Sequence, residues 1–165
     1  MNPKPQSPPP SMQPNSQAAQ NYLRTRVMTA TPEQLQMMLF DGALRFGEQA
    51  RAALAEKNFE QTYNNISRVQ KILTEMLSTL KHDVYPELCG RLAAIYKYVY
   101  KKLIEASVEH KAESLDEAMN LLKFQRDTWA MLMDQVGKAK AGAAATRMAI
   151  PSPDARMEAS ISMSA

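Results

Sequence analysis

The side chains best suited to metal binding or nucleophilic catalysis are few and widely separated in this sequence. The chain has two histidines, His82 and His110, and one cysteine, Cys89. A zinc site needs four ligands, and a di-metal site in a helical bundle needs Glu-x-x-His motifs on two helices. Neither histidine lies in such a motif. We therefore predict no metal and no cofactor, a place at a helix end for His82, and a small apolar role for Cys89.

The carboxylates and glycines also lack the spacing of a catalytic site. Asp41 and Glu48 are expected on one side of a helix, but Arg45 and Arg51 lie near them, which indicates a solvated ion-pair face. The five glycines are dispersed and form no phosphate-binding loop. No Ser-His-Asp or Cys-His set matches a nucleophile motif. We predict that the protein is not an enzyme.

Any binding site must be positioned by four segments of the chain, and in each of them apolar residues recur at the spacing of a helix. Residues 1–20 contain six of the ten prolines, and residues 137–165 are rich in Ala, Ser and Met, so both are predicted to be disordered tails. Residues 21–136 are predicted to form one domain. Its apolar stripes alternate steps of three and four residues and its connections are short. An all-α fold follows, an antiparallel up-down four-helix bundle.

Capping residues mark the predicted helix ends. The expected N-caps and their capping-box partners are Thr31 with Gln34, Asn58 with Gln61, and Ser114 with Glu117. Pro86 is expected near the start of the third helix, and Gly137 is expected to end the fourth.

Each predicted helix has an apolar stripe that is expected to face the core. The expected core residues are Leu35, Leu39, Gly42, Phe46, Ala50 and Ala53 on the first helix, Thr62, Ile66, Val69, Leu73, Met76 and Leu80 on the second, Leu88, Leu92, Ile95, Val99, Leu103 and Ala106 on the third, and Leu115, Ala118, Leu122, Gln125, Trp129, Leu132 and Val136 on the fourth.

Apolar residues also occur outside these stripes. On the first helix they form a second stripe, and on the third helix tyrosines flank the seam; the residues are Met37, Phe40, Leu44, Tyr96, Tyr98, Tyr100 and Leu103. Three interpretations remain open. The residues widen the core, they form a groove for apolar helices of a partner, or residues 20–30 fold back and cover them.

Charge and hydropathy exclude several classes of protein. The net charge is +3, but residues 31–136, which contain the four predicted helices, have 13 Lys and Arg against 15 Asp and Glu, so these helices indicate no basic surface for nucleic acid. No apolar run is long enough to insert into a membrane, and residues 1–20 do not resemble a secretion signal. With a lone cysteine, these features favour the cytosol.

One motif is more specific than the helical pattern. Tyr22, the run TATPEQL at 29–35 and the run MLFDGALRF at 38–46 resemble the flagellin-export chaperone family, FliS. That family has a tyrosine, then Thr-Ala-Ser-Pro-Glu-Glu-Leu, then Met-Leu-Tyr-Asp-Gly. This chain has Thr31 in place of the commoner serine, and Phe40 in place of tyrosine, which removes a hydroxyl group.

The resemblance continues along the chain and spans about residues 20–136. Residues 65–80 and 92–106 are similar to the second and third helices of the family, and Trp129 matches the tryptophan late in its last helix. These later matches are less specific than the Asp-Gly motif with its Thr-Ala-x-Pro-Glu approach.

The resemblance implies a cytosolic four-helix bundle that binds the disordered C-terminal region of flagellin. Such a protein prevents premature polymerisation and assists flagellar secretion. Further candidate partners are the export machinery and other flagellar regulators. The residues expected to bind the partner are Tyr22, Leu23, Phe40, Asp41, Gly42, Leu44, Tyr96, Tyr100 and Leu103.

Two rival classes remain open at this point. The first is a structural bundle whose extra apolar stripes make a homodimer, so the free protein is expected to be a monomer or a weak homodimer. The second is a bundle enzyme with an unrecognised site, which requires a bound metal or cofactor.

Overall fold

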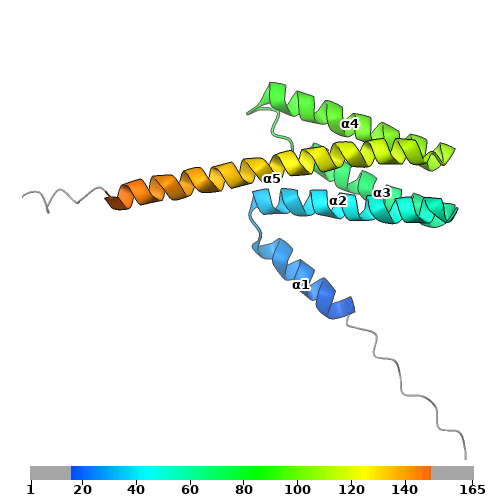
Figure 1. Ribbon diagram of the computed structural model, residues 1–165, viewed down its shortest axis with the longest axis horizontal. Coiled ribbons are helices and arrows are strands. Elements are labelled where there is room, and N and C mark those ends of the chain that lie inside the picture. Colours follow the sequence, from blue (N-terminus) through cyan, green and yellow to red (C-terminus); the bar gives the residue numbers. More distant parts are fainter. Residues whose placement is uncertain (1–15, 150–165) are drawn as a thin grey trace, which may run out of the picture. The chain divides into compact units, whose positions relative to one another are not determined.

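The computed structural model describes residues 16–149, which form five helices joined by short connections (Figure 1). The helices are α1 (Ser16–Thr29), α2 (Pro32–Ala55), α3 (Phe59–Ser78), α4 (Pro86–Glu109) and α5 (Ala112–Ala149). No residue between 16 and 149 is in a strand. The predicted all-α class is therefore confirmed. The remaining parts of the two predicted tails, 1–15 and 150–165, lie outside the described residues.

The described residues divide into two compact units, with the boundary between Leu35 and Gln36. α1 belongs to the first unit and carries arginines but no carboxylate. Two of its threonines donate hydrogen bonds to carbonyl oxygens one turn earlier, Thr25 Oγ1 to Asn21 O and Thr29 Oγ1 to Thr25 O, both at 3.0 Å. Residues 16–20, which the composition assigned to a disordered tail, form the start of this helix.

In the second unit, α2 to α5 form a bundle whose successive helices run in opposite directions (Figure 1). α4 packs against both α3 and α5. Two ion pairs join α2 to α5, because Arg126 Nε lies 3.0 Å from Asp41 Oδ1 and Arg51 Nε lies 2.9 Å from Asp116 Oδ1. The predicted up-down bundle is confirmed.

The core follows the predicted stripes most closely on α3. Thr62, Ile66, Val69, Leu73 and Met76 are all buried there. The stripe on α4 is confirmed in the second half of the helix and the stripe on α5 is confirmed near the start of the helix; the buried predicted residues are Val99, Leu103, Ala106, Leu115, Ala118 and Leu122. The strong apolar periodicity of these segments therefore determines the packing.

On α2 the predicted core face is confirmed at Ala50 and Ala53, which are buried. Earlier in the helix it is wrong by a rotation, because the buried residues are Phe40, Ala43 and Gly47, whereas the predicted Leu35, Leu39, Gly42 and Phe46 are only half-buried. The stripe is built mainly from small residues, so neighbouring side chains can approach the α2 backbone closely. An added Cβ at Gly47 would overlap the Met119 side chain, which makes Gly47 the close-approach position. The bulkier Leu39, Leu44 and Phe46 pack at the edges of the core.

Two of the three predicted capping boxes are confirmed at their N-caps. Gln34 N donates to Thr31 Oγ1 at 3.3 Å while Thr31 N donates to Gln34 Oε1 at 3.0 Å. Gln61 N donates to Asn58 Oδ1 at 3.1 Å.

The capping box predicted at Ser114 and Glu117 is wrong, because α5 already begins at Ala112. Ser114 Oγ instead donates to Glu105 Oε2 on α4 at 3.4 Å. Ser114 therefore takes part in packing α5 against α4, and so does Glu117, which accepts a hydrogen bond from Tyr98 Oη on α4. At the other end of α4, Leu88 was expected in the core but is 57% exposed.

The predicted end of the last helix is also wrong. α5 continues through Gly137 to Ala149 and extends beyond the ends of α2, α3 and α4 (Figure 1). An interior glycine costs a helix about 1 kcal/mol, which the alanine-rich sequence around it tolerates. Between residues 123 and 143 no side chain is fully buried, and Leu132, predicted to face the core, is 47% exposed.

Candidate functional site

Three of the residues expected to bind a partner lie in the core of the bundle. Phe40 and Tyr96 are each 2% exposed, and Leu103 has no exposed surface. Burial raises the pKa of Tyr96 to about 12, because the phenolate would lose its hydration. These side chains can touch a partner only if the bundle opens, so the structure gives them a role in packing.

Asp41 is exposed and forms an ion pair between α2 and α5. Arg126 Nε donates to Asp41 Oδ1 at 3.0 Å, and Arg126 Nη1 donates to Asp127 Oδ1 at 3.3 Å. The hydrogen bond to Asp41, followed by that to Asp127, raises the pKa of Arg126. The carboxylate of Asp41 therefore has a structural partner within this chain.

Gly42 lies beside this ion pair and is not required by close packing. A Cβ built at Gly42 would lie 3.5 Å from Ile72 Cδ1, which is an ordinary van der Waals contact. Leu44 is half-buried nearby on α2, and Tyr100 is half-buried on α4. Asp41, Gly42, Leu44 and Tyr100 are thus the predicted partner-binding residues that retain some surface on the bundle.

Tyr22 and Leu23 belong to the first unit and are exposed. Tyr22 is 68% exposed and Leu23 is 48% exposed on α1. Val27 and Met28 follow them on the same short helix and are 44% and 77% exposed. α1 therefore presents four apolar side chains.

Apolar side chains are also exposed on the outer surface of the bundle. Tyr63 on α3 is 61% exposed, while Ile104 and Val108 on α4 are 45% and 72% exposed. Near them, the rings of Phe59 and His110 stack with centroids 3.9 Å apart and an interplanar angle of 19°. The surplus apolar residues expected from the sequence lie at other positions of α2 and α4, and among them Tyr98 is 43% exposed.

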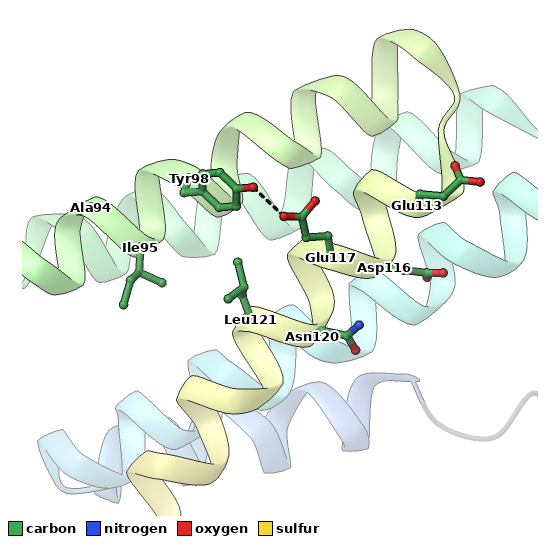
Figure 2. A pocket seen from close by; sticks show the side chains of 8 residues that line it. All are labelled: Ala94, Ile95, Tyr98, Glu113, Asp116, Glu117, Asn120 and Leu121. Carbon is green, nitrogen blue, oxygen red and sulfur yellow. Dashed lines mark hydrogen bonds between the residues drawn. The ribbon is translucent and has the colours of Figure 1, made fainter.

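An open groove between α4 and α5 was not predicted from the sequence. It has a volume of about 860 Å³, and Figure 2 shows the eight residues that line it: Ala94, Ile95, Tyr98, Glu113, Asp116, Glu117, Asn120 and Leu121. The available signal was weak, because Tyr98 had only been placed on the flank of its helix. Of the three carboxylates, Glu117 was expected to complete a capping box with Ser114, and no motif in the sequence includes Glu113 or Asp116.

A hydrogen-bonded network stabilises the centre of this groove. Tyr98 Oη donates to Glu117 Oε1 at 2.6 Å (Figure 2). Lys102 Nζ lies 3.3 Å from Glu117 Oε2 and 3.0 Å from Glu105 Oε2. The Tyr98 hydroxyl, and then Lys102, lower the pKa of Glu117, whereas Lys102 lowers the pKa of Glu105. The hydrogen bond to Glu117 raises the pKa of Tyr98.

The described residues offer no cluster that could hold a metal ion. Within residues 16–149, no three His, Cys, Asp or Glu side chains converge with the required geometry. Cys89 is buried in α4 as a free thiol. No helix in the described range is both long enough and apolar enough to cross a bilayer.

The fold and these surfaces define a helical-bundle protein whose distinctive features are exposed apolar side chains. Comparison with known proteins identifies the family. The family model of the flagellar protein FliS matches residues 15–136. The chain therefore belongs to the FliS family.

Curated relatives extend this assignment. The chain is 30% identical to the flagellar secretion chaperone FliS of Bacillus subtilis over 73% of this chain and 90% of that protein. It is 28% identical to FliS of Escherichia coli over 67% of this chain and 82% of that protein. A crystal structure of a bacterial flagellar chaperone matches with a TM-score of 0.60 at 16% identity, covering 74% of this chain and 99% of that one, which supports the fold. A chaperone role in flagellar export follows, and this role is not enzymatic.

Proposed function

We propose that this protein acts in the cytosol and binds the disordered C-terminal region of flagellin. Binding covers segments that would otherwise form helices and assemble prematurely into the filament, and it assists delivery of flagellin to the export machinery. The protein itself performs no catalysis. The proposal rests on membership of the FliS family and on the apolar surface of the bundle.

The proposal is supported most directly by large apolar side chains that remain exposed, on helices whose other apolar residues already form a core. Tyr63, Ile104 and Val108 are each at least 45% exposed. An amphipathic helix from a partner can bury such side chains through its own apolar residues at i, i+3 and i+4. A disordered partner can fold as it wraps the bundle, which buries a large surface while ordering costs moderate the affinity.

Among the residues expected from the sequence, those that retain surface are proposed as direct contacts. On the bundle these are Asp41, Gly42, Leu44 and Tyr100. Tyr22 and Leu23 of α1 are also proposed, since the resemblance assigns importance to the N-terminal segment of the family.

The test is calorimetric titration of the full chain with the C-terminal segment of a flagellin from the same organism. We expect saturable one-to-one binding, a large negative heat-capacity change and a rise in helicity by circular dichroism. A well-folded protein that does not bind the segment would contradict the proposal. Concentration-dependent dimerisation in sedimentation would then favour the structural-bundle alternative.

A further inference from the structure

The groove between α4 and α5 has a charge that the proposed function does not explain. Glu113, Asp116 and Glu117 line it, and no Lys, Arg or His does. Asp116 is paired with Arg51, and Glu117 is paired with Lys102. Within the described part of the chain, Glu113 has no ion-pair partner within 4.0 Å. Glu113 is therefore the carboxylate of this groove whose charge no side chain of the described residues neutralises.

The groove is also polarised along its length. Ala94, Ile95 and Leu121 form an apolar end, while Glu113 and Asp116 lie at the opposite end (Figure 2). Leu121 and Glu113 are both on α5, and a helix rises about 1.5 Å per residue, so the two ends are roughly 12 Å apart. This distance corresponds to about two turns of a helix.

We propose that this groove binds a short amphipathic helix of a partner protein that carries a lysine or arginine. The partner helix places an apolar side chain against Ile95 and Leu121 and its cation beside Glu113 and Asp116. Charge complementarity selects the occupant, because an acidic segment would be repelled at the second end. The exposed Ala94 has a small side chain, so the partner backbone can approach α4 closely.

Other occupants fit the groove less well. Nucleic acid would bring phosphates against three carboxylates. A metal ion would need a cluster of three ligands, which the residues from 16 to 149 do not form. The groove is open to solvent, whereas a site for a small molecule usually encloses most of its ligand.

The first experiment uses the full chain and synthetic alanine-rich helical peptides of roughly 20 residues, measured by calorimetry or fluorescence anisotropy. One peptide carries Leu at two positions four residues apart and Arg eight residues from the first Leu. A second carries Glu instead of Arg, and each peptide is also made in reversed order to allow for either docking direction. We expect the Arg peptide to bind about fivefold or more tightly than the Glu peptide, with an affinity that falls as salt rises. Equal affinities, or no binding of either peptide, would overturn the proposal.

Variants of the protein then locate the site. Glu113→Lys is expected to weaken binding of the Arg peptide about fivefold. Ala94→Trp is expected to fill the apolar end and weaken binding roughly tenfold or more. Matched controls make the same changes at exposed positions outside the groove, Glu75→Lys on α3 and Ala52→Trp on α2, and should leave affinity unchanged. If a control weakens binding as much as its groove variant, the peptide is not in the groove.

The same variants separate this proposal from the proposed function. Circular dichroism and thermal melting establish that each variant is folded. The flagellin segment is titrated in its own experiment, so its failure to bind would contradict the flagellin proposal and leave the peptide result standing. Failure of the Arg peptide would remove the groove proposal and leave flagellin binding unaffected.

Discussion

Arg126 on α5 donates through Nε to Asp41 Oδ1 on α2, at 3.0 Å. The two side chains are 37% and 53% exposed, so the ion pair is in contact with solvent. The Asp-Gly motif of α2 therefore has a structural use that its sequence alone did not reveal, because Arg126 lies 85 residues away in the chain.

Charge reversal at Asp41 should consequently affect both stability and binding. We expect Asp41→Arg to lower the melting temperature by no more than about 3 °C, because exposed ion pairs contribute little. Flagellin affinity should fall further than this loss of stability explains. Combining Asp41→Arg with Arg126→Asp should restore melting and leave binding impaired. If the swapped pair restores both, Asp41 acts through the fold alone.

Glycine substitutions separate packing from partner contact on α2. Gly42→Ala should stabilise the protein by about 0.5–1 kcal/mol, because alanine favours the helix and its Cβ meets Ile72 at an ordinary distance of 3.5 Å. Gly47→Val should destabilise it by about 1–3 kcal/mol, because the added atoms overlap Met119. Urea unfolding measures both. A stabilised Gly42→Ala variant with reduced flagellin affinity would support Gly42 as a contact, and unchanged affinity would argue against that role.

The fold was predictable where one apolar face dominates a helix, as on α3, whose central residues Ile66, Val69 and Leu73 are buried as expected. It was not predictable on α2, where two apolar stripes compete. A stripe rule favours the larger residues Leu39 and Phe46, but the core contains Ala43 and Gly47, because the Met119 side chain lies against the α2 backbone at Gly47.

The candidate site was less predictable than the fold. Tyr96 and Tyr100 are four residues apart and look alike in the sequence, yet only Tyr96 is fully buried. The α4–α5 groove forms between residues of two consecutive helices. The apolar spacing within each helix does not reveal which residues of α4 face which residues of α5. The spacing of Glu117 indicated a capping box, while its actual partners, Tyr98 and Lys102, lie on α4.

Core and surface positions on α4 should respond differently to truncation. Leu103→Ala should destabilise the bundle by about 2–5 kcal/mol, since Leu103 has no exposed surface. At temperatures where this variant remains folded, its flagellin affinity should match that of the wild type. Tyr100→Ala should weaken binding more than it lowers stability, because Tyr100 is half-buried at the surface. Calorimetry and chemical unfolding of both variants test this contrast, and the opposite ranking would make Leu103 a contact.

The late titration of Tyr96 provides a check on the core. The pKa of Tyr96 is raised to about 12, so burial of its neutral phenol contributes stability that is complete below pH 10. That contribution is lost as the pH rises from about 10 through about 12, because the unfolded chain releases its proton first. Absorbance near 295 nm should show Tyr96 ionising late in the native protein, together with Tyr98, whose pKa the hydrogen bond to Glu117 also raises. Tyr96→Phe should reduce the amplitude of this late phase, whereas Tyr85→Phe, at a side chain 63% exposed, should leave it unchanged.

The melting temperature at acidic pH should depend on the network that joins Glu105, Glu117, Lys102 and Tyr98. Folding lowers the pKa values of Glu105 and Glu117, chiefly through Lys102 for Glu105 and Tyr98 for Glu117. Their contribution is therefore present above the ordinary carboxyl pKa of about 4.3 and is lost as the pH falls through the lowered values. Lys102→Met should flatten the decline in melting temperature below pH 5 relative to the wild type. Lys97→Met, an exposed change on the same helix, should keep the wild-type slope. Parallel curves for wild type and Lys102→Met would show that the network does not contribute to acid sensitivity.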